Sequence, residues 1–305
     1  MGKIAFVFSG QGAQYSGMGR ELADRSPAAR SIFAAADALR PGTSEQCFAA
    51  SMEELCETKN TQPCMFAVEL AAAAALREAG IPADLAAGFS LGELAALTFA
   101  GAMDFETGFS LVCRRAEHMQ KAAEARDTAM AAVLKLAPDA VRTLCAQFDA
   151  VYPVNFNCPG QVTVSAAAEQ MPAFLAAVKA AGGRAVPLRV RGGFHSPFMA
   201  EAATAFASDL STAKLNAPAL PVYANRTAQP YGADVAGMLA GQIDHPVLWE
   251  DSVRAMIAAG TDTFLELGPG RTLCGLIAKT DASVRTFAAE KTEDFEKLLQ
   301  EVAPC

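Results

Sequence analysis

The stretch LAAGFSLGELAAL, residues 85–97, holds the pattern that decides the fold. An apolar run is followed by Gly-Phe-Ser-Leu-Gly and then by a helix-forming run, which predicts a strand, a tight turn and a helix. The glycines on either side of Ser90 let the backbone bend and a substrate come close. The following helix directs its N-terminal amides and the positive end of its dipole at an oxyanion formed there. We therefore expect Ser90 to be a nucleophile on an elbow between strand and helix.

The rest of the chain alternates predicted strands and helices, which is typical of an α/β protein. A buried strand at 3–8 runs into a glycine loop, and a long helix over 104–125 follows the elbow. Further along, we predict a strand over 184–190 and helices over 197–212 and 247–259. Residues 127–190 have the order strand, helix, strand, strand, helix, strand, which is that of a ferredoxin-like (βαββαβ) unit. We predict that this small domain is inserted into a larger α/β-hydrolase-like domain formed by residues 1–126 and 191–305. The cleft between the two is the expected site.

The composition of the chain limits the classes of protein to which it can belong. The chain has 305 residues, 52% of them hydrophobic, so it can bury a large core. Its 25 basic and 33 acidic residues give a net charge of −8, which argues against general nucleic-acid binding. No apolar stretch approaches the ~20 residues of a membrane span, and no cleavable signal pattern begins the chain, so we expect a cytoplasmic protein. The eight cysteines are scattered without metal-ligand spacing, which predicts free thiols and no metal site.

A nucleophilic serine needs a base, and the chain has three histidines. His195 lies in GGFHSP, just after a predicted strand and just before a helix that Ser196 and Pro197 would start. His118 lies within the long helix and His245 precedes a proline, positions typical of structural or surface histidines. His195 is therefore the expected general base, accepting the Ser90 proton on a neutral imidazole.

Two arginines, Arg114 and Arg115, lie on the long helix after the elbow. A guanidinium turned toward the serine would bind a carboxylate through two parallel hydrogen bonds and select an acyl group with a free carboxylate. The alternative is a solvated helix face. Helical phase favours that alternative for Arg114 and leaves both interpretations open for Arg115.

The chain resembles the malonyl-CoA:acyl carrier protein transacylases, and it is also similar to the acyltransferase domains of polyketide synthases. The resemblance runs nearly end to end, through the segments FVFSGQGAQYSGMG, TQP, GFSLGELAAL, CRRAEHMQ, PVNFNCPGQV, GGFHSPFM, PVYAN, GQIDHPVLW and ELGPGRTLCGL. It implies Ser90 as nucleophile, His195 as base and Arg115 as the group that binds the substrate carboxylate. It makes the amides of Gln11 and Leu91 the oxyanion hole.

The resemblance also explains why no triad acid stands out. It implies that the main-chain carbonyl of Gln242 orients the histidine in place of an acid. One departure is Phe89, where relatives commonly have histidine, so any contribution from this position must come from packing. In the polyketide acyltransferases that the chain resembles, a phenylalanine before the histidine accompanies the choice of malonyl, where a large ring would leave little room for a methyl branch. The resemblance therefore implies that Phe194 favours malonyl over methylmalonyl.

The resemblance implies a ping-pong transfer of malonyl from malonyl-CoA, through a malonyl-serine, to the phosphopantetheine thiol of acyl carrier protein in fatty acid synthesis. CoA enters as the thioester substrate, and no metal or redox cofactor is needed. Carrier proteins of this family are strongly acidic, so exposed Arg184, Arg189 and Arg191 are the expected docking residues. We expect a monomer.

Three alternatives stay open. The first is a free-standing acyltransferase that serves a polyketide synthase and shares every motif. The second is an esterase or thioesterase with the same elbow, for which a carboxylate-binding Arg115 has no use. The third is a non-enzymatic binding module, which the joint presence of nucleophile, base and arginine argues against.

Overall fold

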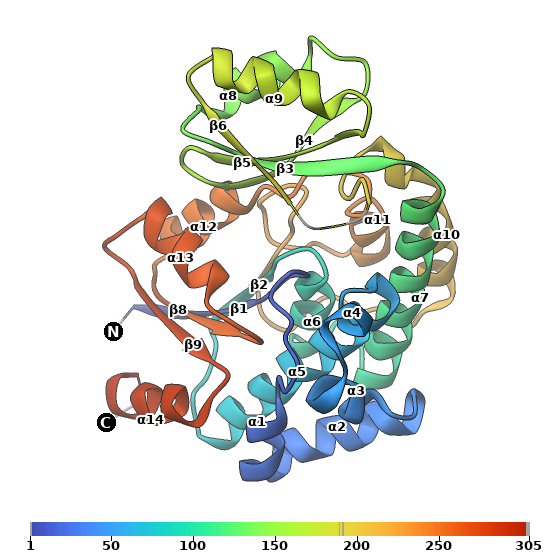
Figure 1. Ribbon diagram of the computed structural model, residues 1–305. Coiled ribbons are helices and arrows are strands. Elements are labelled where there is room, and N and C mark those ends of the chain that lie inside the picture. Colours follow the sequence, from blue (N-terminus) through green and yellow to red (C-terminus); the bar gives the residue numbers. More distant parts are fainter. Residues whose placement is uncertain (1, 189, 191, 303–305) are drawn as a thin grey trace.

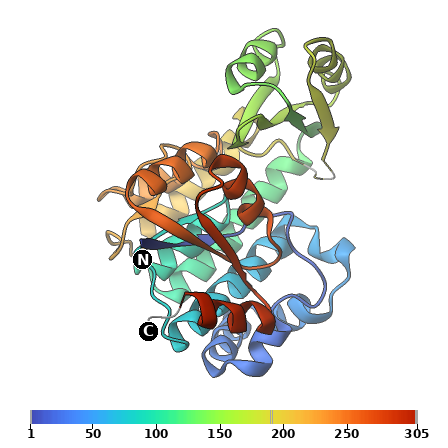
Figure 2. The ribbon, with the colours of Figure 1, turned by 90° about the vertical axis from the view of Figure 1, so that its left-hand side faces the viewer.

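A computed structural model describes residues 2–188, 190 and 192–302 of the chain. They form a mixed α/β fold with two separate β-sheets, one parallel and one antiparallel (Figure 1). The view in Figure 2 shows the antiparallel sheet and its two helices standing at one end of the larger body. Within the part of the chain just defined, no helix is both long and apolar enough to cross a membrane.

The parallel sheet has the strand order β7-β2-β1-β8-β9. Its strands are β1 Lys3–Phe8, β2 Leu85–Gly88, β7 Val222–Tyr223, β8 Thr261–Leu267 and β9 Arg285–Ala289. β1 lies in the middle, and its side chains alternate between two cores: Phe6 and Phe8 pack into one, Ala5 and Val7 into the other. This burial on both faces explains why β1 is apolar from Ile4 to Phe8.

Helices cover both faces of the parallel sheet. The larger core takes side chains from α1 Arg20–Arg25, α2 Pro27–Leu39, α3 Thr43–Ala49, α4 Met52–Leu55, α5 Thr58–Glu78, α6 Gly92–Phe99, α7 Phe105–Glu124, α10 Ala200–Thr212, α11 Val235–Ala240 and α14 Thr292–Glu301. The smaller core takes them from α12 Trp249–Ala258 and α13 Thr272–Thr280.

The antiparallel sheet has the order β4-β5-β3-β6. It is built from β3 Thr128–Leu134, α8 Pro138–Cys145, β4 Val151–Cys158, β5 Gln161–Ala167, α9 Met171–Ala180 and β6 Arg184–Pro187. The two helices cover one face of this sheet (Figure 1), and a third core lies between them and the strands. The order strand, helix, strand, strand, helix, strand is the one that the sequence predicts.

Most predicted boundaries agree with the structure, and the differences have local causes. The helix expected over 197–212 begins with a 3-10 turn at Pro197–Met199, and α10 follows it. The helix expected from residue 247 begins two residues later, because the Val247 amide donates to the Val154 carbonyl of β4. The strand expected over 184–190 ends at Pro187, although the Leu188 amide still donates to the Met130 carbonyl of β3.

Candidate active site

Ser90 lies at the sharp turn between β2 and α6. Its φ of 56° is in the left-handed region, which only a tightly determined turn imposes on a non-glycine residue. A Cβ on Gly88 would lie 1.9 Å from the Gly92 carbonyl carbon, and one on Gly92 would lie 2.4 Å from the Phe8 carbonyl oxygen. Both glycines of the pentapeptide are therefore required for the close approach of backbone at this elbow.

His195 faces the serine from the loop before the 3-10 turn. Ser90 Oγ and His195 Nε2 are 2.7 Å apart, and His195 is only 3% exposed. On the other side of the ring, Nδ1 lies 3.0 Å from the Gln242 carbonyl oxygen and 3.2 Å from that of His245. Because two carbonyl oxygens can only accept, they place the proton on Nδ1 and leave Nε2 to accept from the serine.

Burial sets the protonation state of this histidine. Desolvation lowers the pKa of His195 to about 4, and the nearby Arg115 charge acts in the same direction, while the two carbonyl oxygens oppose it. The imidazole is therefore neutral at physiological pH and free to accept a proton. The carbonyl oxygens of Gln242 and His245 lie next to the ring, so they stabilise the positive charge of the imidazolium that forms during the reaction.

Helix α7 turns Arg115 inward and Arg114 outward. Arg115 is fully buried, whereas the Arg114 side chain is 62% exposed and pairs with Glu117. The Arg115 guanidinium donates from Nη1 to Gln62 Oε1 at 2.7 Å. From Nη2 it donates to Gln242 Oε1 at 2.7 Å and to Ser90 Oγ at 3.2 Å. Packing thus decides that Arg115 faces the serine and not solvent, a question that helical phase left open.

Arg115 is a buried charge whose direct partners are neutral. Its hydrogen-bonded contacts among the described residues are two amide oxygens and a hydroxyl, and its Nε has no partner there. Desolvation lowers the pKa of Arg115 to about 10, and the Glu93 charge opposes this shift, so the guanidinium stays charged at neutral pH. A buried cation next to the nucleophile is the local requirement for binding an anionic acyl group.

The other two histidines have other partners. His118 Nε2 lies 2.7 Å from Asp209 Oδ2, on the side of α7 that faces α10. His245 Nδ1 lies 2.7 Å from Asp244 Oδ1, and its contribution to the site is its main-chain oxygen. The structure therefore brings one imidazole to Ser90.

The two residues predicted for the oxyanion hole come from two segments that meet at Phe89, since a Cβ on Gly10 would lie 2.8 Å from the Phe89 ring. Leu91 follows the serine and precedes the first turn of α6, and Gln11 belongs to the glycine loop after β1. Neither amide donates a hydrogen bond to another described residue, so both are free to bind a substrate oxygen. The side chain of Gln11 donates to Thr58 Oγ1 at 3.3 Å, which ties this loop to the start of α5.

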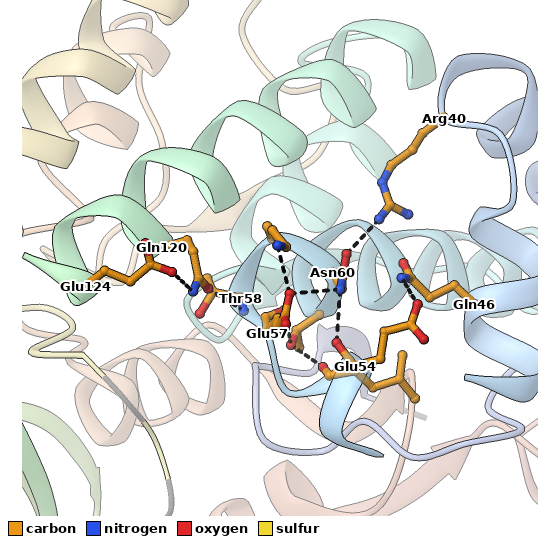
Figure 3. Close-up of polar contacts among 11 residues, drawn as sticks. Arg40, Gln46, Glu54, Glu57, Thr58, Asn60, Gln120 and Glu124 are labelled. Carbon is orange, nitrogen blue, oxygen red and sulfur yellow. Dashed lines mark hydrogen bonds and ion pairs between the residues drawn. The ribbon is translucent and has the colours of Figure 1, made fainter. Parts of the chain in front are cut away.

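Polar contacts also fix the start of α5, which carries Gln62. Figure 3 shows Gln120 of α7 beside Thr58: the Thr58 amide donates to Gln120 Oε1 at 2.9 Å, and Gln120 Nε2 donates to Glu124. Asn60 accepts from Arg40 Nη2 at 2.9 Å (Figure 3). These contacts hold α5 against its neighbours and so place the Gln62 oxygen on Arg115.

Sequence reasoning assigned no role to three polar residues of this network. Gln62, Glu93 and Asn225 are all buried, and their hydrogen bonds lead to Arg115 or to the serine backbone. The signal that could have found them is a charged or amide side chain within an otherwise apolar run, as in GELAAL and PVYAN.

A cleft of about 1210 Å³ opens between the two sheets. On one side it is lined by Gln11, Phe89 and the start of α13, and on the other by polar residues of the antiparallel sheet, including Asn157 and Thr163. The cleft therefore passes Phe89, which precedes Ser90 in the chain. The Phe89 ring packs edge-on against Trp249, with centroids 5.5 Å apart, so the residue that replaces the common histidine contributes packing.

The predicted docking arginines are only partly described. Arg184 is exposed at the start of β6, and the chain that follows it, at Leu188 and Val190, lines the cleft. Arg189 and Arg191 lie outside the described residues. Seven cysteines are free thiols, five of them buried, while Cys305 lies outside the described part.

An α/β fold that holds a serine on an elbow, within hydrogen-bond distance of a buried histidine, defines an enzyme class that transfers acyl groups through a serine ester. The acyl transferase domain family matches residues 5–295. A malonyl CoA-acyl carrier protein transacylase of Bacillus subtilis is 37% identical over 98% of this chain and 97% of its own length. The chain therefore belongs to the acyl transferase family, among its malonyl CoA-acyl carrier protein transacylases.

Solved structures agree with this assignment. The malonyl CoA-acyl carrier protein transacylase of Clostridium perfringens superposes with a TM-score of 0.95 at 32% identity, covering 98% of this chain and 97% of that one. A malonyl-transacylase in complex with its type II polyketide synthase acyl carrier protein superposes with a TM-score of 0.94 at 33% identity, covering 98% and 99%.

Proposed function

We propose that this protein moves the malonyl group from malonyl-CoA to the phosphopantetheine thiol of acyl carrier protein in fatty acid synthesis. The observation that carries the proposal is the buried Arg115 guanidinium, 3.2 Å from Ser90 Oγ and without a direct ion pair in the described chain. An esterase for neutral acyl chains has no need to bury a cation beside its nucleophile, because the cost of desolvating it must be offset by an anionic partner.

The first half of the reaction forms a malonyl-serine ester. The malonyl carboxylate binds Arg115, Ser90 Oγ attacks the thioester carbonyl, and His195 Nε2 takes the serine proton. The oxyanion accepts hydrogen bonds from the Gln11 and Leu91 amides. When the carbon–sulfur bond breaks, the imidazolium returns its proton to the CoA sulfur.

The second half runs the same steps in reverse with a new thiol. The phosphopantetheine thiol gives its proton to His195 Nε2 and attacks the ester, and the serine oxygen recovers the proton as it leaves. Every group in the two halves belongs to the chain or to a substrate, so we propose that the transfer uses no cofactor beyond the CoA thioester.

The proposal is tested by intact-protein mass spectrometry after brief incubation with malonyl-CoA or acetyl-CoA. We expect a malonyl-sized adduct, little acetyl adduct, and loss of the malonyl adduct on adding acyl carrier protein that bears phosphopantetheine. Acyl carrier protein without that group is the control and should leave the adduct in place. Equal loading of both thioesters, or no loading, would contradict the proposal.

The carrier distinguishes the main function from its nearest alternative. A related structure contains a polyketide synthase carrier protein, which keeps a free-standing polyketide acyltransferase as the second candidate. Transfer rates to a fatty acid and a polyketide carrier protein, measured side by side, decide between them. We expect the fatty acid carrier to be preferred.

We also propose the finer description of the fold. The antiparallel order β4-β5-β3-β6 with two helices on one face supports a ferredoxin-like domain at 127–190. The parallel sheet with its serine elbow supports an α/β-hydrolase-like domain formed by 1–126 and 191–305. A monomer and a cytoplasmic location remain predictions.

Reversing the charge at Arg184 tests carrier docking. Arg184→Glu should raise KM for acyl carrier protein roughly fivefold, the equivalent of about 1 kcal/mol for an exposed charge. Hydrolysis of malonyl-CoA by the same variant should not change, because it does not involve the carrier. The control is Lys179→Glu, an exposed residue of α9 on the opposite side of the antiparallel sheet from the cleft. Equal changes in the two variants, or in both reactions, would contradict docking at Arg184.

A further inference from the structure

A buried glutamate lies beneath the nucleophile and takes no direct part in the mechanism above. Glu93 is in the first turn of α6 and is 1% exposed. Its carboxylate accepts hydrogen bonds from the Tyr231 hydroxyl, from Gln242 Nε2 at 2.9 Å and from the Asn225 amide at 3.2 Å. These three hydrogen bonds offset part of the cost of burying the carboxylate.

Two of these partners also hold the serine backbone. Gln242 Nε2 donates to the Ser90 carbonyl oxygen at 2.6 Å, and Asn225 Oδ1 accepts from the Ser90 amide at 2.7 Å. Asn225 also donates to the Gly88 carbonyl oxygen at 2.5 Å. The strained turn at Ser90 is therefore held from both sides by the side chains of Gln242 and Asn225. Glu93 in turn binds the side chain of Gln242 and the main-chain amide of Asn225.

The orientation of the Gln242 amide links all three reacting groups. Because its Nε2 donates to Glu93 and to Ser90, its Oε1 must face Arg115 Nη2, 2.7 Å away. Its main-chain oxygen meanwhile accepts from His195 Nδ1. One residue thus contacts nucleophile, base and carboxylate-binding arginine, and Glu93 is the anionic acceptor that fixes its side chain.

We propose that Glu93 is a positioning residue for acyl transfer, whose carboxylate fixes Gln242 and Asn225 and through them the relative placement of Ser90, His195 and Arg115. This inference rests on the proposed function. In a Ser-His-Asp triad, an acid in direct contact with the histidine orients it. We assign to Glu93 an indirect form of this role, exerted through Gln242.

The placement predicts a specific pH dependence. Burial raises the pKa of Glu93 to about 7, while hydrogen bonds from Tyr231, Gln242 and Asn225 and the charge of Arg115 oppose the rise. These are the charged and polar groups that face it, and His195 lies beyond Gln242. As the pH falls through about 7, the carboxylate gains a proton and loses an acceptor site, so kcat/KM should fall. We call this fall the acid limb of the pH profile. Protonation of His195 cannot produce it, because the pKa of His195 is lowered to about 4.

The test compares malonyl transfer by three variants over a pH series. Glu93→Gln keeps the size of the side chain but removes its charge and replaces one acceptor oxygen by an NH2 donor, so kcat should fall about 10²-fold with little change in KM, as expected for a small misplacement of reacting groups. Its acid limb near pH 7 should disappear. Tyr231→Phe removes a hydrogen bond that favours the charged form of Glu93, so it should move the limb to higher pH.

Glu69→Gln is the matched control. Glu69 is a fully buried glutamate of α5 whose carboxylate accepts a hydrogen bond from Ser9 Oγ rather than from Gln242 or Asn225, so its variant should keep both the rate and the acid limb. Thermal unfolding of each variant separates misfolding from misplacement. If Glu93→Gln does not fold, an unshifted limb in Tyr231→Phe overturns the proposal, as does a folded Glu93→Gln with normal kcat and limb. A wild-type protein that takes up no malonyl group would instead contradict the proposed function.

Discussion

A Ser90→Ala variant is expected to acquire no malonyl adduct, and its transfer rate should fall by about 10⁵- to 10⁶-fold, the scale seen when an elbow serine is removed from a serine enzyme. The physical reason is that alanine cannot form the ester, while Ser90 Oγ, 2.7 Å away, is the one hydroxyl that hydrogen-bonds to the His195 imidazole among the residues that the structure describes. Intact-protein mass spectrometry after a pulse of malonyl-CoA measures the adduct, and steady-state transfer measures the rate.

The control for Ser90→Ala is Ser110→Ala, the same chemical change at an exposed position of α7. It should load malonyl like the wild type. An adduct that persists in Ser90→Ala would show that another side chain is the nucleophile, and peptide mapping would then identify it. Substrate can still bind in Ser90→Ala, because Arg115 keeps its contacts to Gln62 and Gln242.

The parts of the fold that sequence predicts well are those with local causes. The elbow follows from two glycines that no larger residue could replace at the distances found, and the strand β1 from an apolar run buried on both faces. The start of α7 follows from Asp104, whose carboxylate accepts from the Thr107 amide at 2.9 Å. The contact at Gly88 and the cap at Asp104 each lie within a few residues of the pattern, and burial acts along the whole apolar run of β1.

The parts that sequence alone leaves open depend on contacts between distant segments. Arg114 and Arg115 are neighbours on one helix, and only the packing of α7 against α5 decides which guanidinium is buried. The hydrogen bonds that Glu93 accepts from Asn225 and Gln242 join residues more than a hundred positions apart in the chain. A local sequence pattern therefore cannot predict them. The resemblance pointed to Arg115 and Gln242, and the structure places the first 3.2 Å from Ser90 Oγ and the main-chain oxygen of the second 3.0 Å from His195 Nδ1. The hydrogen bond from the Gln242 side chain to Glu93 could not be predicted from the sequence.

Replacing Arg115 by alanine should change which acyl group the protein accepts. Removing one partner of a buried charge pair costs about 3–5 kcal/mol, which corresponds to about 10²- to 10⁴-fold in kcat/KM for malonyl-CoA. Acetyl-CoA has no carboxylate to lose its partner, so its loading should be unchanged or should rise. Arg115→Lys keeps the charge but loses the planar fork, and it should fall between the two. Competition between malonyl-CoA and acetyl-CoA, read by the mass of the adduct, measures the ratio directly.

Arg114→Ala is the matched control, because it removes the same side chain one position away, where the guanidinium is exposed and pairs with Glu117. It should leave the malonyl-to-acetyl ratio unchanged. A malonyl preference that survives in Arg115→Ala would mean that another group binds the carboxylate, and a loss of both adducts would mean that Arg115 acts mainly by holding Ser90 and Gln242 in place. Selective loss of malonyl loading is the result expected of a buried guanidinium whose hydrogen-bonded partners in the described chain are all neutral.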